Sequence, residues 1–150
     1  MTPGAEAAEF ERRVRASFAR QGLMRTIGAT LGHIAPGSVE ILLVPSPAIS
    51  QQHGFVHAGA VTAIADSAAG YAALSLMPEG RGVLSVEYKI NLLAPAVGDR
   101  IVARGSVVMA GRTLTVAQAE VFAQAAGEER LIALLTATMM TVEGREAITD

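Results

Sequence analysis

The spacing of apolar residues changes several times along the chain, and each spacing predicts a type of element. Phe10, Val14 and Phe18 recur at four-residue intervals as far as Gly22, so residues 1–22 are expected to form a short amphipathic N-terminal helix. Later apolar runs are short, or alternate with polar residues, as β-strands do. They cover residues 27–35, 39–44, 83–93, 101–109, 114–123 and 131–142. A large share of the chain is therefore expected to be β-sheet.

Residues 57–77 are the longest helical candidate, and they are apolar on almost every side. A helix without a polar face is covered by protein all round. The last four strands follow it with hairpin-length links and no helices between them, which argues against a parallel α/β architecture. The pattern predicts an α+β fold: an antiparallel sheet of about six strands wrapped around one long central helix. We expect a single domain over residues 1–150, with the N-terminal helix packed on it.

The composition is apolar for a chain of 150 residues, with 51% hydrophobic and 17% charged residues. Alanine occurs 28 times, so the apolar surplus consists of small side chains that a monomer has difficulty burying. The net charge of −2 is not typical of a protein that binds nucleic acid. The absence of cysteine excludes disulfides and thiolate chemistry. Because the N-terminal residues lack the apolar stretch of a secretory signal, a cytoplasmic location is expected.

A membrane span is the alternative interpretation of the long apolar helix, because residues 58–77 contain one charged residue, Asp66. An aspartate at the centre of a membrane helix costs about 2.5 to 3.5 kcal/mol. Most other positions in the segment are Ala, Gly, Ser or Thr rather than Leu or Ile. A buried core helix is therefore favoured, and no membrane partner is expected.

Asp66 is the first candidate for chemistry, since a carboxylate inside a buried helix needs a partner or a function. The structural explanation is a hydrogen bond to a neighbouring loop or serine. Gly59 favours a function, because it faces the same way to within about 20°, although it lies about 10.5 Å away along the helix. Its backbone N–H is in the first helical turn, where such groups are unpaired and suited to bind an oxyanion.

Two-fold symmetry can bring an aspartate and a glycine amide together although they are far apart in one chain. An antiparallel partner helix would bring Asp66 of one subunit opposite Gly59 of the partner subunit. Eight alanines between residues 58 and 73 fit this arrangement, because small side chains let two helices approach closely. A carboxylate that activates water or attacks, with an oxyanion donor, suits transfer of an acyl group to water. A homodimer with two shared sites is therefore expected.

Other catalytic motifs are missing from the sequence. It has no G-x-S-x-G nucleophile motif, no H-E-x-x-H zinc motif and no glycine-rich phosphate loop. The three histidines, His33, His53 and His57, would bind zinc only if a carboxylate joined them. No metal ion and no cofactor are therefore expected.

A short motif followed by an aspartate resembles a known family. Residues 54–59 (GFVHAG), with Asp66 nine residues after the histidine, are similar to the G-x-x-H-G-G…D signature of the PaaI-type (phenylacetate-degradation) hotdog-fold acyl-CoA thioesterases. The resemblance extends over roughly residues 22–142 and includes residues 83–96 and residues 111–114 (GRTL). It implies the hotdog fold, hydrolysis of acyl-CoA to free acid and CoA, and a homodimer or a dimer of dimers. Coenzyme A then enters only as part of the substrate.

The resemblance assigns roles to four residues. Asp66 matches the catalytic acid, acting as general base or nucleophile, and Gly59 matches the glycine whose amide polarises the thioester carbonyl. Gln51 stands where the family usually has Asn, and is implied to contact the carbonyl or the lytic water. Ser85 matches a Ser or Thr that helps to orient that water. In such enzymes these groups face one another across the subunit interface, with Asp66 and Ser85 on one side.

Two residues depart from the family pattern. Ala58 replaces the first glycine of the usual pair and adds a methyl group at the start of the helix, although Gly59 keeps its amide. Gln51 is one methylene longer than the usual Asn, so its contact is either remade or lost. Neither change removes the base or the oxyanion donor. We therefore expect an active thioesterase with a shifted specificity.

Four further residues are candidates for binding the substrate. Ala58 and His57 lie at the helix start, where a structural hydrogen bond is the favoured role for His57. Arg112 can meet a phosphate of coenzyme A through its forked donors, or lie solvated in its turn. Asn91 is expected to share the polar face of its strand with Ser85, where it either binds substrate or pairs with a neighbouring element.

Two other functions stay open at this point. A non-catalytic protein of the same fold would bind acyl-CoA or a lipid in the same cleft, and the ligand would stabilise it without turnover. A dehydratase that acts on acyl thioesters needs a histidine and an acid in one site. His57 and Asp66 supply such a pair only across subunits.

Overall fold

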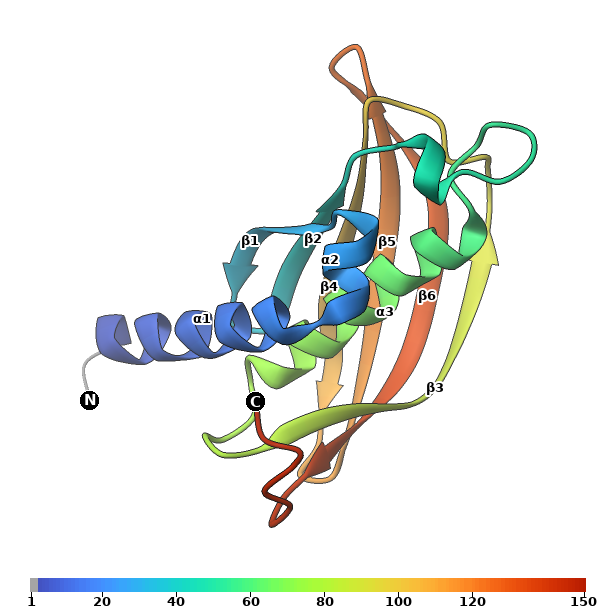
Figure 1. Ribbon diagram of the computed structural model, residues 1–150. Coiled ribbons are helices and arrows are strands. Elements are labelled where there is room, and N and C mark those ends of the chain that lie inside the picture. Colours follow the sequence, from blue (N-terminus) through green and yellow to red (C-terminus); the bar gives the residue numbers. More distant parts are fainter. Residues whose placement is uncertain (1–2) are drawn as a thin grey trace.

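The computed structural model describes residues 3–150 as a six-stranded antiparallel sheet curled around one long helix (Figure 1). Two helices come first, followed by a hairpin, the long helix and four more strands. The elements are α1 (Pro3–Arg20), α2 (Gly22–Ile27), β1 (Thr30–Ala35), β2 (Ser38–Leu43), the short 3₁₀ turn η1 (Pro47–Ile49), α3 (Ala58–Leu74), β3 (Gly82–Leu92), β4 (Arg100–Ala110), β5 (Leu114–Ala125) and β6 (Glu128–Val142). The α+β class and the sheet wrapped around its helix are confirmed.

The sheet order explains why one strand stands apart from its sequence neighbours. The strands lie in the order β1-β2-β4-β5-β6-β3, so β3 is at an edge and pairs only with β6. This edge strand has 11 residues and remains open to solvent along most of its length. Its apolar side chains Val86, Tyr88 and Leu92 are all about half exposed. An edge of this length and character is suited to pair with a second chain.

The N-terminal region differs from the sequence prediction. The apolar periodicity predicted one helix ending at Gly22 and a strand from residue 27, but Gly22 instead opens a second helix, α2. Burial of Met24 fixes α2 on the core, and Gly28 ends it with a left-handed backbone (φ 74°) that glycine adopts without strain. Strand β1 consequently begins at Thr30 rather than at residue 27.

Helix α3 is only partly covered. From Ala68 to Leu74 every residue is buried, as the apolar sequence predicted, whereas the first half is open on one side. On that side Gly59 is exposed, and Thr62 and Asp66 are half-buried. No element of residues 3–150 packs over this stripe, so the prediction that protein covers both faces of the helix stays a prediction that requires the partner subunit.

Helix α3 packs very closely on β4, and a glycine makes this possible. A Cβ atom at Gly105 would lie 2.2 Å from the backbone C and O atoms of Ala68, closer than any real contact. Ala68 and Ala69 are fully buried at the same place. Small residues on the helix and a glycine on the strand thus bring the two backbones together and fix the height of α3 above the sheet.

Arg13 of α1 binds the C-terminal end of α3. Its Nη2 donates to the carbonyl oxygens of Leu74 at 2.6 Å and Met77 at 2.7 Å, and the side chain is buried. The carbonyl oxygens at the end of a helix lack partners from a following turn, and the negative end of the helix dipole lies there. A buried guanidinium supplies both hydrogen-bond donors and a positive charge. Arg13 thereby ties the N-terminal helix to the central one.

Replacing Arg13 with methionine is expected to lower the free energy of unfolding by about 2 kcal/mol or more. Methionine keeps most of the apolar stem but removes the donor to the Met77 oxygen and one of the two donors to the Leu74 oxygen, which keeps the Met77 N–H at 3.0 Å. Arg12→Met is the matched control, because Arg12 is exposed and pairs only with Glu9 one turn away; it should change stability by no more than about 0.5 kcal/mol. Urea unfolding of both variants measures the difference, and equal losses would contradict the capping role.

Candidate active site

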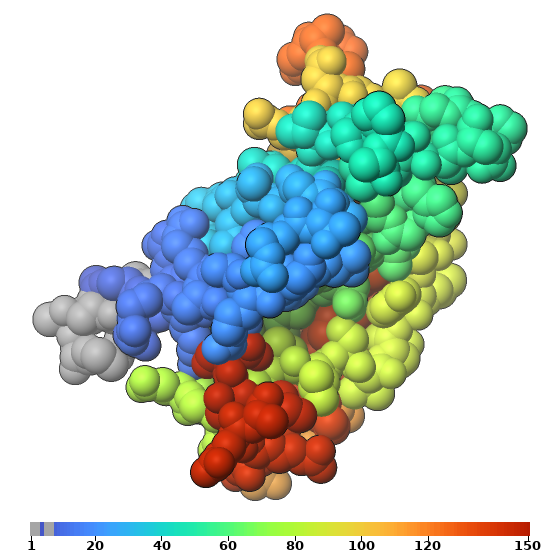
Figure 2. All heavy atoms as spheres, viewed as in Figure 1, coloured from blue at the N-terminus to red at the C-terminus, as the bar shows by residue number. Residues whose placement is uncertain are grey.

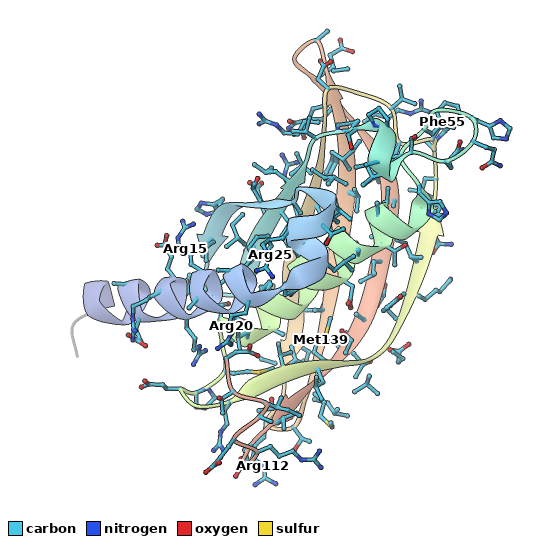
Figure 3. The ribbon with its side chains drawn as sticks, viewed as in Figure 1. Arg15, Arg20, Arg25, Phe55, Arg112 and Met139 are labelled. Carbon is cyan, nitrogen blue, oxygen red and sulfur yellow. The ribbon has the colours of Figure 1, made fainter. Side chains whose placement is uncertain are left out.

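Asp66 is held by a hydrogen bond from the edge strand. It lies in the middle of α3, half-buried, and accepts a hydrogen bond from Ser85 Oγ on β3 at 2.7 Å through Oδ1. Within residues 3–150 its second oxygen, Oδ2, has no hydrogen-bond partner. The Ser85 hydroxyl also lies 3.4 Å from Sδ of Met139 on β6 (Figure 3). One carboxylate oxygen is thus fixed while the other is available for chemistry.

A β-bulge in β3 turns Ser85 toward the helix. Ser85 pairs with Met139, but the next residue in register is Glu87, which pairs with Thr138, so Val86 is an extra residue. A bulge shifts the alternation of side chains by one position. Ser85 therefore shares the inner face of the sheet with the side chains that face α3.

The same bulge corrects the expected placement of Asn91. Strict alternation put Ser85 and Asn91 on one polar face. In the structure Asn91 pairs with Leu134, which is partly exposed, whereas Ala133 and Leu135 on either side of Leu134 are fully buried. Asn91 consequently lies on the outer face, opposite Ser85. The expectation of a shared face is wrong, because one inserted residue reverses the phase of the strand.

His57 caps the start of α3. It is the residue before the helix, and its Nδ1 accepts a hydrogen bond from the Gly59 backbone N–H at 2.8 Å. A neutral imidazole that accepts at Nδ1 carries its hydrogen on Nε2. The favoured structural role of His57 is confirmed, and the expectation that the Gly59 N–H is unpaired is wrong for the free chain, since the preceding side chain binds it.

Gln51 lies beside this helix start, in the loop after η1. Its Oε1 accepts a hydrogen bond from the backbone N–H of His53, which leaves the Nε2 of the carboxamide available as a donor. Gln51, His57 and Ala58 line one cavity of about 490 Å³, together with Phe55 at the protruding loop (Figure 3). The remaining walls of this cavity are mostly apolar.

Asp66 and Ser85 line a different cavity. It measures about 360 Å³ and lies between the α1–α2 junction, α3 and the start of β3, where Figure 2 shows a hollow. The two cavities share no lining residue. Along α3, Gly59 and Asp66 are about 10.5 Å apart. A single chain thus holds two incomplete halves of the predicted site: a carboxylate with its serine, and a helix start with its amide and carboxamide donors.

Arg112 is not brought to either half. It lies in the turn between β4 and β5 and borders a small cavity of about 110 Å³ with Leu76 and Met77, after the end of α3. Figure 3 places Arg112 and Phe55 at opposite ends of the molecule.

Sequence reasoning missed a polar network on the wall of the Asp66 cavity. Tyr71, almost fully buried in α3, accepts a hydrogen bond from Gln21 Nε2 at 2.8 Å, and its hydroxyl lies 3.2 Å from Ser17 Oγ. Burial raises the pKa of the Tyr71 hydroxyl, so the group stays protonated. A tyrosine in an otherwise apolar helix was the available signal, because a buried hydroxyl needs a partner.

Comparisons with known proteins identify a family and similar folds. The sequence model of the thioesterase superfamily matches residues 53–129. The crystal structure of a thioesterase family protein from Silicibacter pomeroyi is 52% identical, with a TM-score of 0.88 over 90% of this chain and 99% of that one. The PaaI protein of E. coli, from the phenylacetic acid degradation operon, has a TM-score of 0.83 at 19% identity, covering 92% of this chain and 96% of that one.

A third solved structure, the thioesterase HI1161 from Haemophilus influenzae, has a TM-score of 0.77 at 19% identity over 85% of this chain and 87% of that one. At these lower identities the likeness concerns the fold. Among curated protein sequences, none matches the chain. Within residues 3–150, no helix has both the length and the apolar character needed to cross a bilayer.

Proposed function

The chain belongs to the thioesterase superfamily, and on this basis we propose that it hydrolyses acyl-CoA thioesters to the free acid and CoA, as a member of the PaaI type. The observation that carries the proposal is the hydrogen bond from Ser85 to Asp66 at the mouth of an open cavity. It presents a carboxylate oxygen, oriented but unpaired within residues 3–150, where a substrate can reach it.

A homodimer completes the site in this proposal. The open edge strand β3 and the uncovered stripe of α3 are in contact, because Ser85 of β3 hydrogen-bonds Asp66 of α3. A two-fold partner can therefore cover both at once. Antiparallel packing of the two α3 helices places Asp66 beside Gly59 of the partner subunit. Two equivalent sites result, and pairing of two such dimers is a further expectation.

In each site the thioester carbonyl accepts a hydrogen bond from the amide of Gly59, with Gln51 Nε2 as a second donor. The carbonyl takes the place of the His57 ring on that amide, because one N–H serves one strong acceptor at a time. The Nδ1 of His57 is then released as an acceptor on the wall of the same cavity. Ala58 forms part of this wall, and its methyl group narrows the space beside the acyl carbon.

Asp66 acts on the polarised carbonyl in one of two ways. As general base, Oδ2 takes a proton from water while the water oxygen attacks the carbonyl carbon. The C–S bond then breaks, and the proton passes to the leaving sulfur to give CoA and the free acid. As nucleophile, Oδ2 attacks the carbon itself, the C–S bond breaks, and CoA leaves as a thiolate that takes a proton from water. Water then hydrolyses the resulting anhydride to the free acid and the Asp66 carboxylate. In both cases Ser85 holds Oδ1 and so aims Oδ2.

A thiol-release assay tests the proposal. The purified protein is expected to liberate free thiol from members of a panel that includes butyryl-, hexanoyl- and phenylacetyl-CoA, with turnover proportional to protein concentration. A non-catalytic binding protein would show a higher melting temperature with these ligands and no thiol. Thermal stabilisation without thiol release would therefore overturn the proposal, and hydration of an enoyl-CoA would indicate the dehydratase instead.

A further inference from the structure

The cavity beside Asp66 holds a second carboxylate, that of Asp150, which is surrounded by three donors from two elements. Ser17 Oγ of α1 donates to Oδ1 at 2.5 Å, and Arg20 Nη2 of the same helix lies 3.2 Å from that oxygen. The backbone N–H of Val83 in β3 donates to Oδ2 at 3.3 Å. The Asp150 side chain is only 19% exposed.

The buried members of the network point their hydrogens toward this carboxylate. Ser17 is buried and gives its one hydrogen to Asp150, so in its contact with Tyr71 it is the acceptor and the Tyr71 hydroxyl is the donor. Tyr71 in turn accepts from Gln21. The hydrogen bonds therefore run in one direction, from Gln21 through Tyr71 and Ser17 to the carboxylate, and Arg20 adds a positive charge.

Asp150 is placed to be exchanged for a ligand. Two of its three contacts are longer than 3.1 Å, and its own backbone N–H makes only a 3.4 Å contact, to the Arg81 carbonyl. The segment that carries it crosses the lower border of the hollow (Figures 1 and 2). Substituting a ligand carboxylate for that of Asp150 leaves the charge beside Asp66 unchanged, so the exchange carries no new electrostatic penalty.

The cavity has room between the two carboxylates. Tyr71, which contacts Ser17 and so marks the end of the cavity where Asp150 lies, comes five residues after Asp66 in α3. Five residues correspond to about 7.5 Å along the helix axis. Gly70 lies between them and lines the cavity, and a Cβ atom there would meet nothing closer than Met139 Cε at 4.0 Å. The space an acyl chain would occupy is therefore not filled by a side chain.

We propose that Ser17, Arg20 and the Val83 amide form a subsite for the distal carboxylate of an acyl group, occupied in the free protein by Asp150. The substrates are then monothioesters of short dicarboxylic acids. This inference rests on the proposed function and names the substrate class of the same site.

Glutaryl-CoA and pentanoyl-CoA test the subsite, because they differ in the terminal group of one acyl length. We expect kcat/KM to favour glutaryl-CoA. Arg20→Met should lower the ratio of the two kcat/KM values by about tenfold or more, since a hydrogen bond to a charged group is lost. Asp150→Asn should raise the ratio by weakening the internal competitor. Arg15→Met, one or two turns earlier in α1 and paired with Glu11, is the control and should leave the ratio unchanged.

The outcomes separate the subsite from the proposed function. Thiol release from pentanoyl-CoA with no preference for glutaryl-CoA, or a ratio unmoved by Arg20→Met, overturns the subsite and leaves the hydrolase. No thiol release from either ester, nor from the other CoA esters of the panel, overturns the hydrolase. In that case calorimetric binding of the two CoA esters decides the subsite: tighter binding of glutaryl-CoA that Arg20→Met abolishes supports it, and equal binding overturns it.

Discussion

Asp66→Asn is expected to lower kcat for thioester hydrolysis by at least about 100-fold, the usual contribution of a positioned base. Asparagine fills the same space and still accepts the hydrogen bond from Ser85 through its carbonyl oxygen. It neither takes a proton from water nor attacks a carbonyl. Because the shape is kept, the loss should appear in kcat, with little change in folding. Steady-state thiol release measures it.

Asp99→Asn is the matched control, since Asp99 is exposed in the link before β4 and borders neither half of the site. It should keep the wild-type kcat. Circular dichroism and size-exclusion chromatography should be the same for both variants. An Asp66→Asn protein with wild-type turnover would exclude Asp66 as base or nucleophile.

Mixing experiments extend this prediction to the shared site. Gly59→Pro removes the proposed oxyanion donor in the first turn of α3, where the backbone N–H makes no hydrogen bond to a helix carbonyl. Alone it should be as impaired as Asp66→Asn. Co-refolded in equal amounts, the two should regain about a quarter of wild-type activity, because half of the dimers are mixed and each has one intact site. Failure to regain activity would place both groups in one subunit.

Gly105→Ala is expected to lower the free energy of unfolding by about 3 kcal/mol or more. The added methyl group would meet the backbone of Ala68 at 2.2 Å, and a backbone does not move aside as a flexible side chain does. Either α3 lifts off β4 or the strand bends, and both open the core. Such a loss is a large part of the stability of a typical domain. Urea or thermal unfolding measures it.

Gly70→Ala provides the comparison, because the same methyl group is added to α3 where space allows it. Removing a glycine from a helix interior should raise stability by up to about 1 kcal/mol. Opposite signs for the two variants would identify the close approach as the cause. If Gly105→Ala were as stable as the wild type, the helix would not be held at this height by the glycine.

The sequence was sufficient for the architecture because the strongest signals are local. The apolar run at residues 57–77 predicted α3 to within a few residues, and the alternating runs predicted all six strands. Gly22 was misinterpreted because glycine both ends helices and begins them, and only the burial of Met24 decides between the two. Ile27 likewise fits a strand or a helix until its neighbours are known.

The site was predictable as a set of residue types but not as contacts. That Asp66 and Gly59 share one face of α3 follows from helix geometry alone. That Ser85 bonds to Asp66 depends on a bulge, and the alternation of the sequence around Val86 gives no sign of it. The capping of Gly59 by His57 depends on a side-chain rotamer, and the wall at Tyr71 depends on where α1 docks. These contacts depend on tertiary structure, which local sequence patterns do not predict.

Because of the extra residue at Val86, the number of residues in β3 determines whether Ser85 reaches Asp66. In a regular strand a single alternation of side chains decides which face Ser85 occupies and which faces the later residues of β3 occupy, so neither part of the strand could change face without the other. The bulge uncouples them, so the two parts of β3 can diverge separately by substitution. Gain or loss of a single residue between positions 85 and 87, by contrast, would turn Ser85 away from Asp66 while changing the amino-acid content hardly at all.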